Sequence, residues 1–236
     1  MDADAIRRLY DREYAAAYDA SYLLGDNFRE CTEYELSLIE GFLRSARSWL
    51  DVACGTGYFL SRFAGVERCG LDLSPAMLAQ VRQANPGVTF VEGDYRVDRP
   101  EWHDCWDLVS CMWYAYCYAG SVSEIETVVR NLAAWTAPDG VCFLPVCDPD
   151  VLCKTRIPYR PAADSSDGRL EVTAVVWNWI DEPSGKRHAG LVAPHVDCLV
   201  ALFELLFRDV HLHTYPAFRS DCLESRKAII ARRKRC

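Results

Sequence analysis

The chain has 236 residues, of which 50% are hydrophobic and 25% charged, which is enough apolar material for one sizeable core in one domain. A formal net charge of −8 without a long basic run offers little for binding a phosphate backbone. No apolar run reaches the roughly 18 residues that a transmembrane helix needs. We therefore expect neither nucleic acid nor a membrane as a partner.

Cysteine is frequent, with twelve residues, and many lie inside apolar runs, as do Cys142 and Cys198. A free thiol in such a run behaves as a small buried hydrophobe. Residues 1–8 are charged and contain no apolar stretch, so we expect no signal peptide and a cytoplasmic protein. No Cys-x-x-Cys pair occurs and the five histidines lack zinc-ligand spacing near cysteines, so we expect no metal site.

Short apolar runs alternate with amphipathic stretches up to Cys147, a pattern typical of a parallel sheet covered by helices. Ser74 before Pro75 is a typical helix start, because serine caps the helix and proline fits its first turn. The pattern predicts strands over 48–53, 68–73, 88–92, 106–111 and 140–147, with helices over 74–84 and 122–135.

The alternation ends after the fifth strand. Residues 156–167 are rich in Pro, Asp and Ser and are expected to form a loop. Two strands over 170–180 and 186–192, joined by turn residues, predict a β-hairpin. A helix over 195–207 and two strands over 209–215 and 226–232 are expected to follow.

Both ends of the chain have a distinct pattern. The first 45 residues are helix-like, and Ile6, Tyr10, Tyr14 and Tyr18 recur at spacings of four, which would place them on one helical face. This face either packs against the sheet or belongs to a lid that closes over a ligand. Residues 226–235 are basic and are expected to form a final strand with a solvated basic end, rather than a tail that binds nucleic acid or a membrane.

The first predicted strand ends in a ligand-binding pattern. Asp51 is followed by Gly55 and Gly57 and then by a helix, which places backbone N–H groups and a helix N-terminus against a ligand. Small residues allow the ligand to approach the main chain closely. Residues 58–60 are Tyr-Phe-Leu, so the third glycine of a nicotinamide-binding loop is missing.

Residues 51–57, Asp-Val-Ala-Cys-Gly-Thr-Gly, resemble the first motif of the class I S-adenosylmethionine (SAM)-dependent methyltransferases, with Ala53 in place of the commoner first glycine. The resemblance covers almost the whole chain and is to small-molecule enzymes of the bacterial type. It implies a Rossmann-like, doubly wound, seven-stranded α/β sheet, mostly parallel with an antiparallel last strand. One domain would comprise an N-terminal helical lid (1–45), a SAM-binding core (46–147), a hairpin insertion (168–193), and the last helix and strands (194–236).

The resemblance also implies that SAM is the cofactor, with Asp51 holding its amino group beside backbone groups near Ala53 and Gly55. Asp72 ends the second strand, where doubly wound nucleotide sites place a carboxylate that accepts from both ribose hydroxyls. Asp94, in a turn at the end of the third strand, would accept from the adenine amine. The other residues expected near the cofactor are Tyr14, Cys54, Gly57, Leu73, Met77, Gly93, Tyr95, Cys111, Met112 and Trp113.

The fourth strand leads into residues 112–118, Met-Trp-Tyr-Ala-Tyr-Cys-Tyr, at the sheet edge where open α/β folds bind ligands. Aromatic faces attract a sulfonium without competing as nucleophiles, although any single ring could simply pack beneath a loop. The Asn/Asp-Pro-Pro-Tyr motif of amide and nucleobase N-methyltransferases is absent, which argues against a DNA base or protein glutamine as acceptor. Residues expected around the substrate are Tyr10, Tyr14, Tyr18, Trp113, Tyr114, Tyr116, Asp148, Trp177 and Trp179.

A general base is optional, because a neutral amine needs none, whereas a phenol, a hydroxyl or an acidic carbon would benefit from one. His188 and His195 are the candidates, together with Asp148 at the end of the fifth strand, and Tyr116 is the further catalytic candidate. Either histidine could instead be half-buried or cap a helix. Trp177 and Trp179 would share one face of their strand, with Asn178 on the other.

The leading hypothesis is methyl transfer from SAM to an N, O or C nucleophile of a small metabolite or natural-product intermediate, by in-line displacement. One alternative uses SAM itself as substrate, through intramolecular attack that yields azetidine-2-carboxylate and methylthioadenosine. A second alternative is a non-catalytic SAM-binding subunit, although neither a degraded glycine loop nor a missing ribose acid is seen. Whether the chain forms a homodimer is left open.

Overall fold

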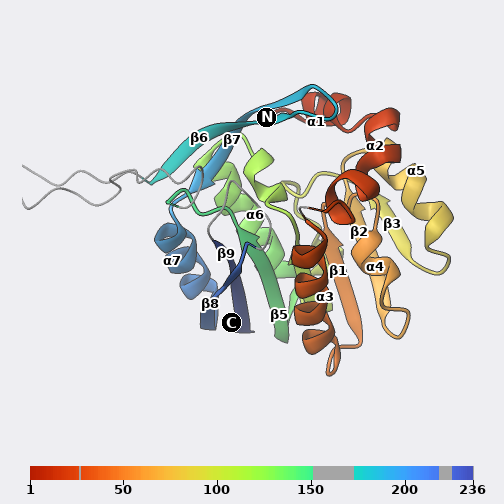
Figure 1. Ribbon diagram of the computed structural model, residues 1–236. Coiled ribbons are helices and arrows are strands. Elements are labelled where there is room, and N and C mark those ends of the chain that lie inside the picture. The colour runs from red at the N-terminus through yellow and green to blue at the C-terminus, as the bar shows by residue number, and fades with distance from the viewer. Residues whose placement is uncertain (27, 151–172, 218–224, 236) are drawn as a thin grey trace, which may run out of the picture.

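The computed structural model describes residues 1–26, 28–150, 173–217 and 225–235. Seven strands form one sheet in the order β3-β2-β1-β4-β5-β9-β8 (Figure 1). Strands β1 to β5 are parallel, while β9 runs antiparallel between β5 and β8. The predicted doubly wound sheet is therefore confirmed. Its strands are β1 Ser48–Val52, β2 Glu67–Asp72, β3 Thr89–Glu92, β4 Trp106–Cys111, β5 Thr136–Val146, β8 Phe207–Pro216 and β9 Ser225–Lys234.

Helices cover both faces of the sheet. Buried side chains of α3, α4 and α5 form a core with one face, and those of α6 and α7 form a core with the other. Strand β1 illustrates the division, because Trp49 faces the first core while Leu50 and Val52 face the second. The helices are α1 Ala3–Leu9, α2 Arg12–Tyr18, α3 Arg29–Leu43, α4 Tyr58–Ser61, α5 Pro75–Ala84, α6 Val122–Trp135 and α7 Val196–Leu206.

Helix α5 starts as the sequence predicts. Ser74 has extended backbone angles, and its hydroxyl accepts from the backbone N–H of Met77 at 3.2 Å. Pro75 then occupies the first turn. This cap fixes the chain directly after Asp72 and so helps to position that carboxylate.

The N-terminal segment is not one helix, and the predicted single aromatic face is wrong in this respect. Helix α1 ends before Tyr10, whose φ of −93° and ψ of 55° leave the helical region. Asp11 then begins α2 by accepting from the backbone N–H of Tyr14 at 3.0 Å. A π-helix, η1 Asp19–Leu23, continues α2. The rings still meet: the centroids of Tyr10 and Tyr14 lie 5.4 Å apart.

The predicted hairpin forms a separate two-stranded sheet of β6 Ala174–Asp181 and β7 Lys186–Pro194. In Figure 1 it lies beside α1 across one end of the main sheet. Lys186 Nζ fixes this contact by donating to the Leu9 carbonyl at 2.6 Å and pairing with Asp11 at 2.7 Å. The predicted loop over 156–167 and the first three residues of the predicted strand 170–180 lie outside the described residues.

Three further findings concern the described part of the chain. None of its helices is long and apolar enough to cross a membrane. It contains no cluster of three or more His, Cys, Asp or Glu side chains arranged to hold a metal ion. Eight of its cysteines are free thiols, and seven of these eight are buried.

Candidate functional site

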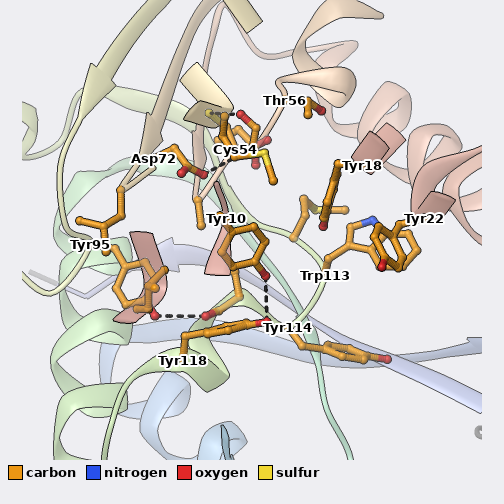
Figure 2. A pocket seen from close by; sticks show the side chains of 18 of the residues that line it. Tyr10, Tyr18, Tyr22, Cys54, Thr56, Asp72, Tyr95, Trp113, Tyr114 and Tyr118 are labelled. Carbon is orange, nitrogen blue, oxygen red and sulfur yellow. Dashed lines mark hydrogen bonds between the residues drawn. The ribbon is translucent and has the colours of Figure 1, made fainter. Parts of the chain in front are cut away.

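A cavity opens at the carboxyl ends of β1, β2 and β4, between the sheet, the N-terminal helices and the hairpin (Figure 2). The two halves of its wall differ in chemistry: acids and the glycine loop form one part, and aromatic side chains form most of the other. The predicted residues in the wall are Tyr10, Tyr18, Asp51, Ala53, Cys54, Gly55, Asp72, Leu73, Met77, Gly93, Asp94, Tyr95, Met112, Trp113, Tyr114, Trp177 and Trp179.

The loop after β1 is built from residues with positive φ. Ala53, Gly55 and Gly57 have φ values of 56°, 56° and 66°. A Cβ on Gly55 would meet no heavy atom within 4 Å, so this glycine leaves open space beside the cavity. A Cβ on Gly57 would lie 2.0 Å from Val81 Cγ2, so this glycine instead allows close packing on α5 and does not line the cavity. The two glycines therefore have different tasks.

Asp51, the penultimate residue of β1, belongs to a buried chain of hydrogen bonds. Trp49 Nε1 donates to Ser110 Oγ at 2.8 Å, and Ser110 Oγ donates to Asp51 Oδ1 at 2.6 Å. Burial raises the pKa of Asp51 to about 7, although the bond from Ser110 acts in the opposite direction. A cationic group of a ligand would favour the ionised carboxylate, so the site is matched to an ammonium.

Asp72 is held one strand away by backbone donors. The N–H of Gly55 donates to Oδ2 at 2.7 Å, and the N–H of Ser74 donates to Oδ1 at 2.8 Å. Burial raises the pKa of this carboxyl to about 6 despite these bonds. Each carboxylate oxygen has a second acceptor position, so Asp72 can still accept from a ligand hydroxyl.

Asp94 lies in the wall but is already bound by protein. Arg96 donates to both of its oxygens, with Nη2 to Oδ2 at 2.6 Å and Nε to Oδ1 at 2.9 Å. Burial raises the pKa of Asp94, but the bonds from Arg96 outweigh this and keep it below its usual value. The expected bond from an adenine amine would have to share these oxygens with Arg96.

The N-terminal segment is fastened directly to the cofactor-side loops. The Ser74 hydroxyl donates to the Tyr10 carbonyl at 2.6 Å, and the Thr56 hydroxyl bonds the Asp19 carboxylate of the π-helix. Tyr10, Tyr18 and Tyr22 contribute ring faces to the cavity wall beneath this cover (Figure 2). Lid closure stays a prediction, but the contacts that close the segment over the site are present.

The turn after β4 carries the aromatic half of the wall. Trp113 and Tyr114 have left-handed φ values of 54° and 59°, a conformation that costs a non-glycine residue about 1 kcal/mol or more. The Tyr95 hydroxyl stabilises the turn by donating to the Ala115 carbonyl at 3.1 Å (Figure 2). This conformation presents both rings to the cavity.

His188 on β7 lies behind the wall rather than in it. The Tyr10 hydroxyl donates to that of Tyr118 at 2.8 Å, and Tyr118 Oη lies 2.6 Å from His188 Nδ1. Tyr14, also outside the cavity, lies 3.5 Å from His188 Nε2 through its hydroxyl. Burial lowers the pKa of His188 to about 4, so the ring is neutral near pH 7. His188 is therefore not a strong base, and it does not line the cavity in which a substrate would lie.

Several predicted residues lie elsewhere, and the expected roles do not fit their surroundings. His195 caps α7, where its Nδ1 accepts from the Asp197 N–H at 3.2 Å. Asp148 is buried in an ion pair with Lys227, because antiparallel β9 brings that lysine beside the end of β5. Tyr116 is fully buried, and its hydroxyl accepts from the Cys147 N–H at 2.9 Å. Cys111 is buried in the core.

Sequence reasoning missed several residues of the wall. Arg226 belongs to the basic final strand that the sequence predicts and was not among the expected site residues, yet it is only 3% exposed and lines the cavity. Thr56 stands between the two glycines, and Tyr118 ends the aromatic segment, so the neighbouring pattern could have indicated both. Leu23 ends η1 and Phe28 directly precedes α3, and no sequence pattern comparable to those above marks either residue as part of the wall.

Comparison with known proteins identifies relatives of this chain. Residues 50–140 match a family model described as a methyltransferase domain. A dTDP-4-amino-2,3,4,6-tetradeoxy-D-glucose N,N-dimethyltransferase from Saccharopolyspora spinosa is 32% identical over 142 residues, which cover 58% of this chain and 55% of that protein. A dTDP-3-amino-3,6-dideoxy-alpha-D-glucopyranose N,N-dimethyltransferase from Streptomyces fradiae is 32% identical, over 56% of this chain and 52% of the relative. The matched part thus spans about half the length of these relatives.

Solved structures share the fold over nearly the full chain. The SAM-bound amino pentose methyltransferase CalS10 from Micromonospora echinaspora has a TM-score of 0.60 and 24% identity, covering 94% of this chain and 98% of its own. The CcbJ methyltransferase from Streptomyces caelestis has a TM-score of 0.62 and 19% identity, covering 95% and 98%. These likenesses establish the architecture.

Proposed function

We propose that this protein, a member of the class I SAM-dependent methyltransferase family, transfers the methyl group of SAM to a neutral amine of a small natural-product intermediate. One observation carries the proposal: Asp51, Asp72 and the open face of Gly55 line the same cavity as the aromatic turn after β4. A single chamber can therefore hold a charged nucleoside at one part and a second molecule beside it.

The residues present fit the cofactor. Asp51 is a buried carboxyl whose pKa is raised to about 7 and whose charge the ammonium of SAM would compensate. Asp72 retains acceptor positions for the ribose hydroxyls, and Leu73 and Met77 supply apolar surface for the adenine. Asp94 and Gly93 would lie near the adenine edge, with Asp94 shared with Arg96.

Bound SAM would supply an electrophilic methyl group, which the amine nitrogen takes with its lone pair as the C–S bond breaks and its electrons return to sulfur. The protein's task is then to align the two groups and to exclude water. Trp113 and Tyr114 would flank the reacting groups with ring faces that favour a positive centre. Tyr10 and Tyr18 would close the chamber from the N-terminal side.

The hydrogen-bonded set of Tyr10, Tyr118 and His188 fits a positioning role. A neutral His188 accepts a hydrogen bond from the Tyr118 hydroxyl through Nδ1 and so orients that hydroxyl. The Tyr118 oxygen in turn accepts a hydrogen bond from the Tyr10 hydroxyl. Burial raises the pKa of Tyr10 and Tyr118 well above the ordinary value, so both keep their protons. Their oxygens can accept from the amine N–H groups and point its lone pair toward the methyl group.

Nitrogen is favoured over oxygen or carbon by two observations. The relatives named above are N,N-dimethyltransferases, and no histidine lines the described part of the cavity wall. A phenol or alcohol would need a base, while the cavity acids lie around the glycine loop and the adjoining strand ends. An amine needs only to arrive uncharged.

The test is to incubate the protein with SAM and a panel of amino sugars, other primary amines and phenols, with analysis by mass spectrometry. We expect methylated amine together with S-adenosylhomocysteine (SAH). Asp51→Asn should weaken SAM binding, whereas Asp139→Asn, at the opposite edge of the sheet, should bind normally and serves as the matched control.

Other outcomes would replace the proposal with one of its alternatives. Methylthioadenosine formed from SAM alone would show that SAM is the substrate of an intramolecular cyclisation. Tight SAM binding without turnover on any acceptor would favour a non-catalytic subunit. Methylated phenols without methylated amines would move the nucleophile from nitrogen to oxygen.

A further inference from the structure

Arg226 is a buried cation in the cavity wall. It is the second residue of β9, and its side chain is 3% exposed. The guanidinium carbon lies 4.8 Å from the ring centroid of Trp113 and 5.4 Å from that of Tyr114. Among the described residues that line the cavity, it is the one with a permanent positive charge. The aromatic half of the chamber therefore has a cationic side.

The charge of Arg226 is only partly compensated by protein. Its Nη1 lies 3.5 Å from Glu35 Oε1, at the limit of a hydrogen bond. That same oxygen also accepts from the Tyr215 hydroxyl at 2.7 Å and from the Cys31 thiol at 3.5 Å. Among the described residues, Arg226 Nε is buried without a partner, and so is Glu35 Oε2.

If the ion pair of Arg226 and Glu35 only stabilised the fold, more of its buried hydrogen-bonding atoms would be expected to have partners. A buried guanidinium normally forms several bonds, because each unpaired buried donor costs free energy. In the part of the chain that the structure describes, this planar donor with five N–H groups has one long bond, to a carboxylate that is engaged elsewhere. The aromatic faces of Trp113 and Tyr114 stabilise its charge but provide no acceptor for Nε.

We propose that Arg226 binds an anionic oxygen group of the acceptor, a carboxylate or a phosphate, and so holds the amine for methylation. The inference deepens the proposed function and rests on it. The Asp51 and Asp72 part of the cavity would attract cations, so the acceptor would be oriented with its anionic group at Arg226. The substrate class is then a molecule with an uncharged amine that also carries a carboxylate or phosphate, rather than an amine without an anionic group.

The site can be tested without turnover. In protein saturated with SAH, the ¹H–¹⁵N resonance of Arg226 Nε–H, assigned by its loss in Arg226→Lys, is followed during titration with sodium phosphate and with sodium acetate. Sodium chloride at matched ionic strength is the reference. We expect a saturable shift with phosphate, acetate or both, and the stronger binder identifies the source of the anionic group. No shift beyond that in chloride overturns the inference.

Two variants test the same site during catalysis. Because Arg226→Met alone would leave Glu35 as an unpaired buried acid, it is combined with Glu35→Gln. We expect the double variant to lose about 10- to 100-fold in kcat/KM on an amino acid, and to act on the matching neutral methyl ester as the unmodified protein does. Glu35→Gln alone is the control and should bind phosphate or acetate more tightly, because the competing carboxylate is gone.

The outcomes separate this inference from the proposed function. Equal losses on the charged acceptor and its neutral ester, or none on either, would overturn the anion site while methyl transfer itself stands. A saturable Nε–H shift in a protein that methylates no amine would leave the anion site in place and remove the proposed reaction.

Discussion

Protonation of Asp51 should control cofactor binding below pH 7. Burial raises the pKa of this carboxyl to about 7 in the free protein. The ammonium of SAM or SAH requires the ionised form, so binding must release the proton. With a pKa of about 7, the ionised fraction is roughly 9% at pH 6 and roughly 1% at pH 5. Affinity for SAH should therefore fall about tenfold per pH unit below pH 7.

Isothermal titration calorimetry with SAH, in buffers of different ionisation enthalpy, measures both the affinity and the protons released. Unmodified protein should release about 0.9 proton from Asp51 at pH 6, and Asp51→Asn should lack that release. Because Asp72 has a pKa of about 6 and can add its own proton, the difference between the two proteins isolates Asp51. Asp51→Asn should also bind SAH about 10- to 100-fold more weakly above pH 7, through loss of a charged hydrogen bond.

The stability of the free protein should also depend on the protonation state of Asp51, and the raised pKa fixes the direction of that dependence. A folded-state pKa above the unfolded value means that the contribution of Asp51 to the stability of free protein is fully present below about pH 4 and is lost as pH rises through 7. The ammonium of SAH would compensate the charge of ionised Asp51 and so offset this loss of stability. The increase in melting temperature that SAH causes should therefore grow between pH 5 and 7. A pH-independent affinity over that range, or equal proton release by Asp51→Asn and Asp139→Asn, would refute the reasoning.

Gly57→Ala should lower the free energy of unfolding in urea by ~2–4 kcal/mol, because its Cβ would lie 2.0 Å from a methyl carbon of α5 at a φ of 66°. Gly55→Ala, with open space at the Cβ, should lose only the ~1–2 kcal/mol of the backbone conformation, and equal losses would contradict this distinction. His188→Phe should slow turnover by about tenfold through loss of one hydrogen bond and leave the pH limbs of kcat/KM in place, since the pKa of His188 is about 4; a vanished limb would make it the base. Glu35→Ala should destabilise the fold by ~3–5 kcal/mol in urea unfolding by leaving Arg226 unpaired, and a second change of Arg226→Met should restore most of it.

The positions of Asp51 and Asp72 in the proposed cofactor site could be predicted because they depend on strand ends alone. In a parallel sheet the carboxyl ends of neighbouring strands meet at one edge, so Asp51 and Asp72 had to lie close together once their strands were identified. The register confirms that pairing, with Asp51 beside Gly70 and Val52 beside Leu71. Local rules were sufficient here because no distant segment is needed.

In the N-terminal segment, residues 1–23, the spacing of the aromatic residues alone gives a wrong prediction. A repeat of four predicts one continuous face through Tyr10, but the repeat does not show whether the helix itself continues. The cap at Asp11 breaks it and was readable in the sequence as an aspartate before a helical run. Leu23 and Phe28 lie between the regular part of η1 and the start of α3, where no comparable sequence rule predicts the position of a side chain.

Arg226 was missed for a reason of topology. The basic composition of residues 226–235 predicts a final strand with a solvated end but does not show which of its residues are solvated, and that strand is antiparallel to β5. An antiparallel strand begins where its parallel neighbours end, so its first residues lie at the ligand-binding edge and its last residues at the opposite edge. Lys227 pairs with Val146, and Arg226 lies beyond it at the cavity, while Arg233 is exposed. The predicted strand direction, applied to the tail, would have led to this placement.

Charge movement during the proposed reaction would explain why an amine suits a chamber lined largely by apolar and aromatic side chains. Attack by a neutral amine on a sulfonium moves one positive charge from sulfur to nitrogen and neither creates nor destroys it. The ring faces of Trp113 and Tyr114 can stabilise that charge at both positions without reorganising. A phenol would first have to ionise where burial holds the tyrosine hydroxyls of the wall at raised pKa, as it does for Tyr118. An anionic group at Arg226 would offset the cation formed on the same acceptor, so the site would meet a substrate whose net charge falls toward zero as methylation proceeds.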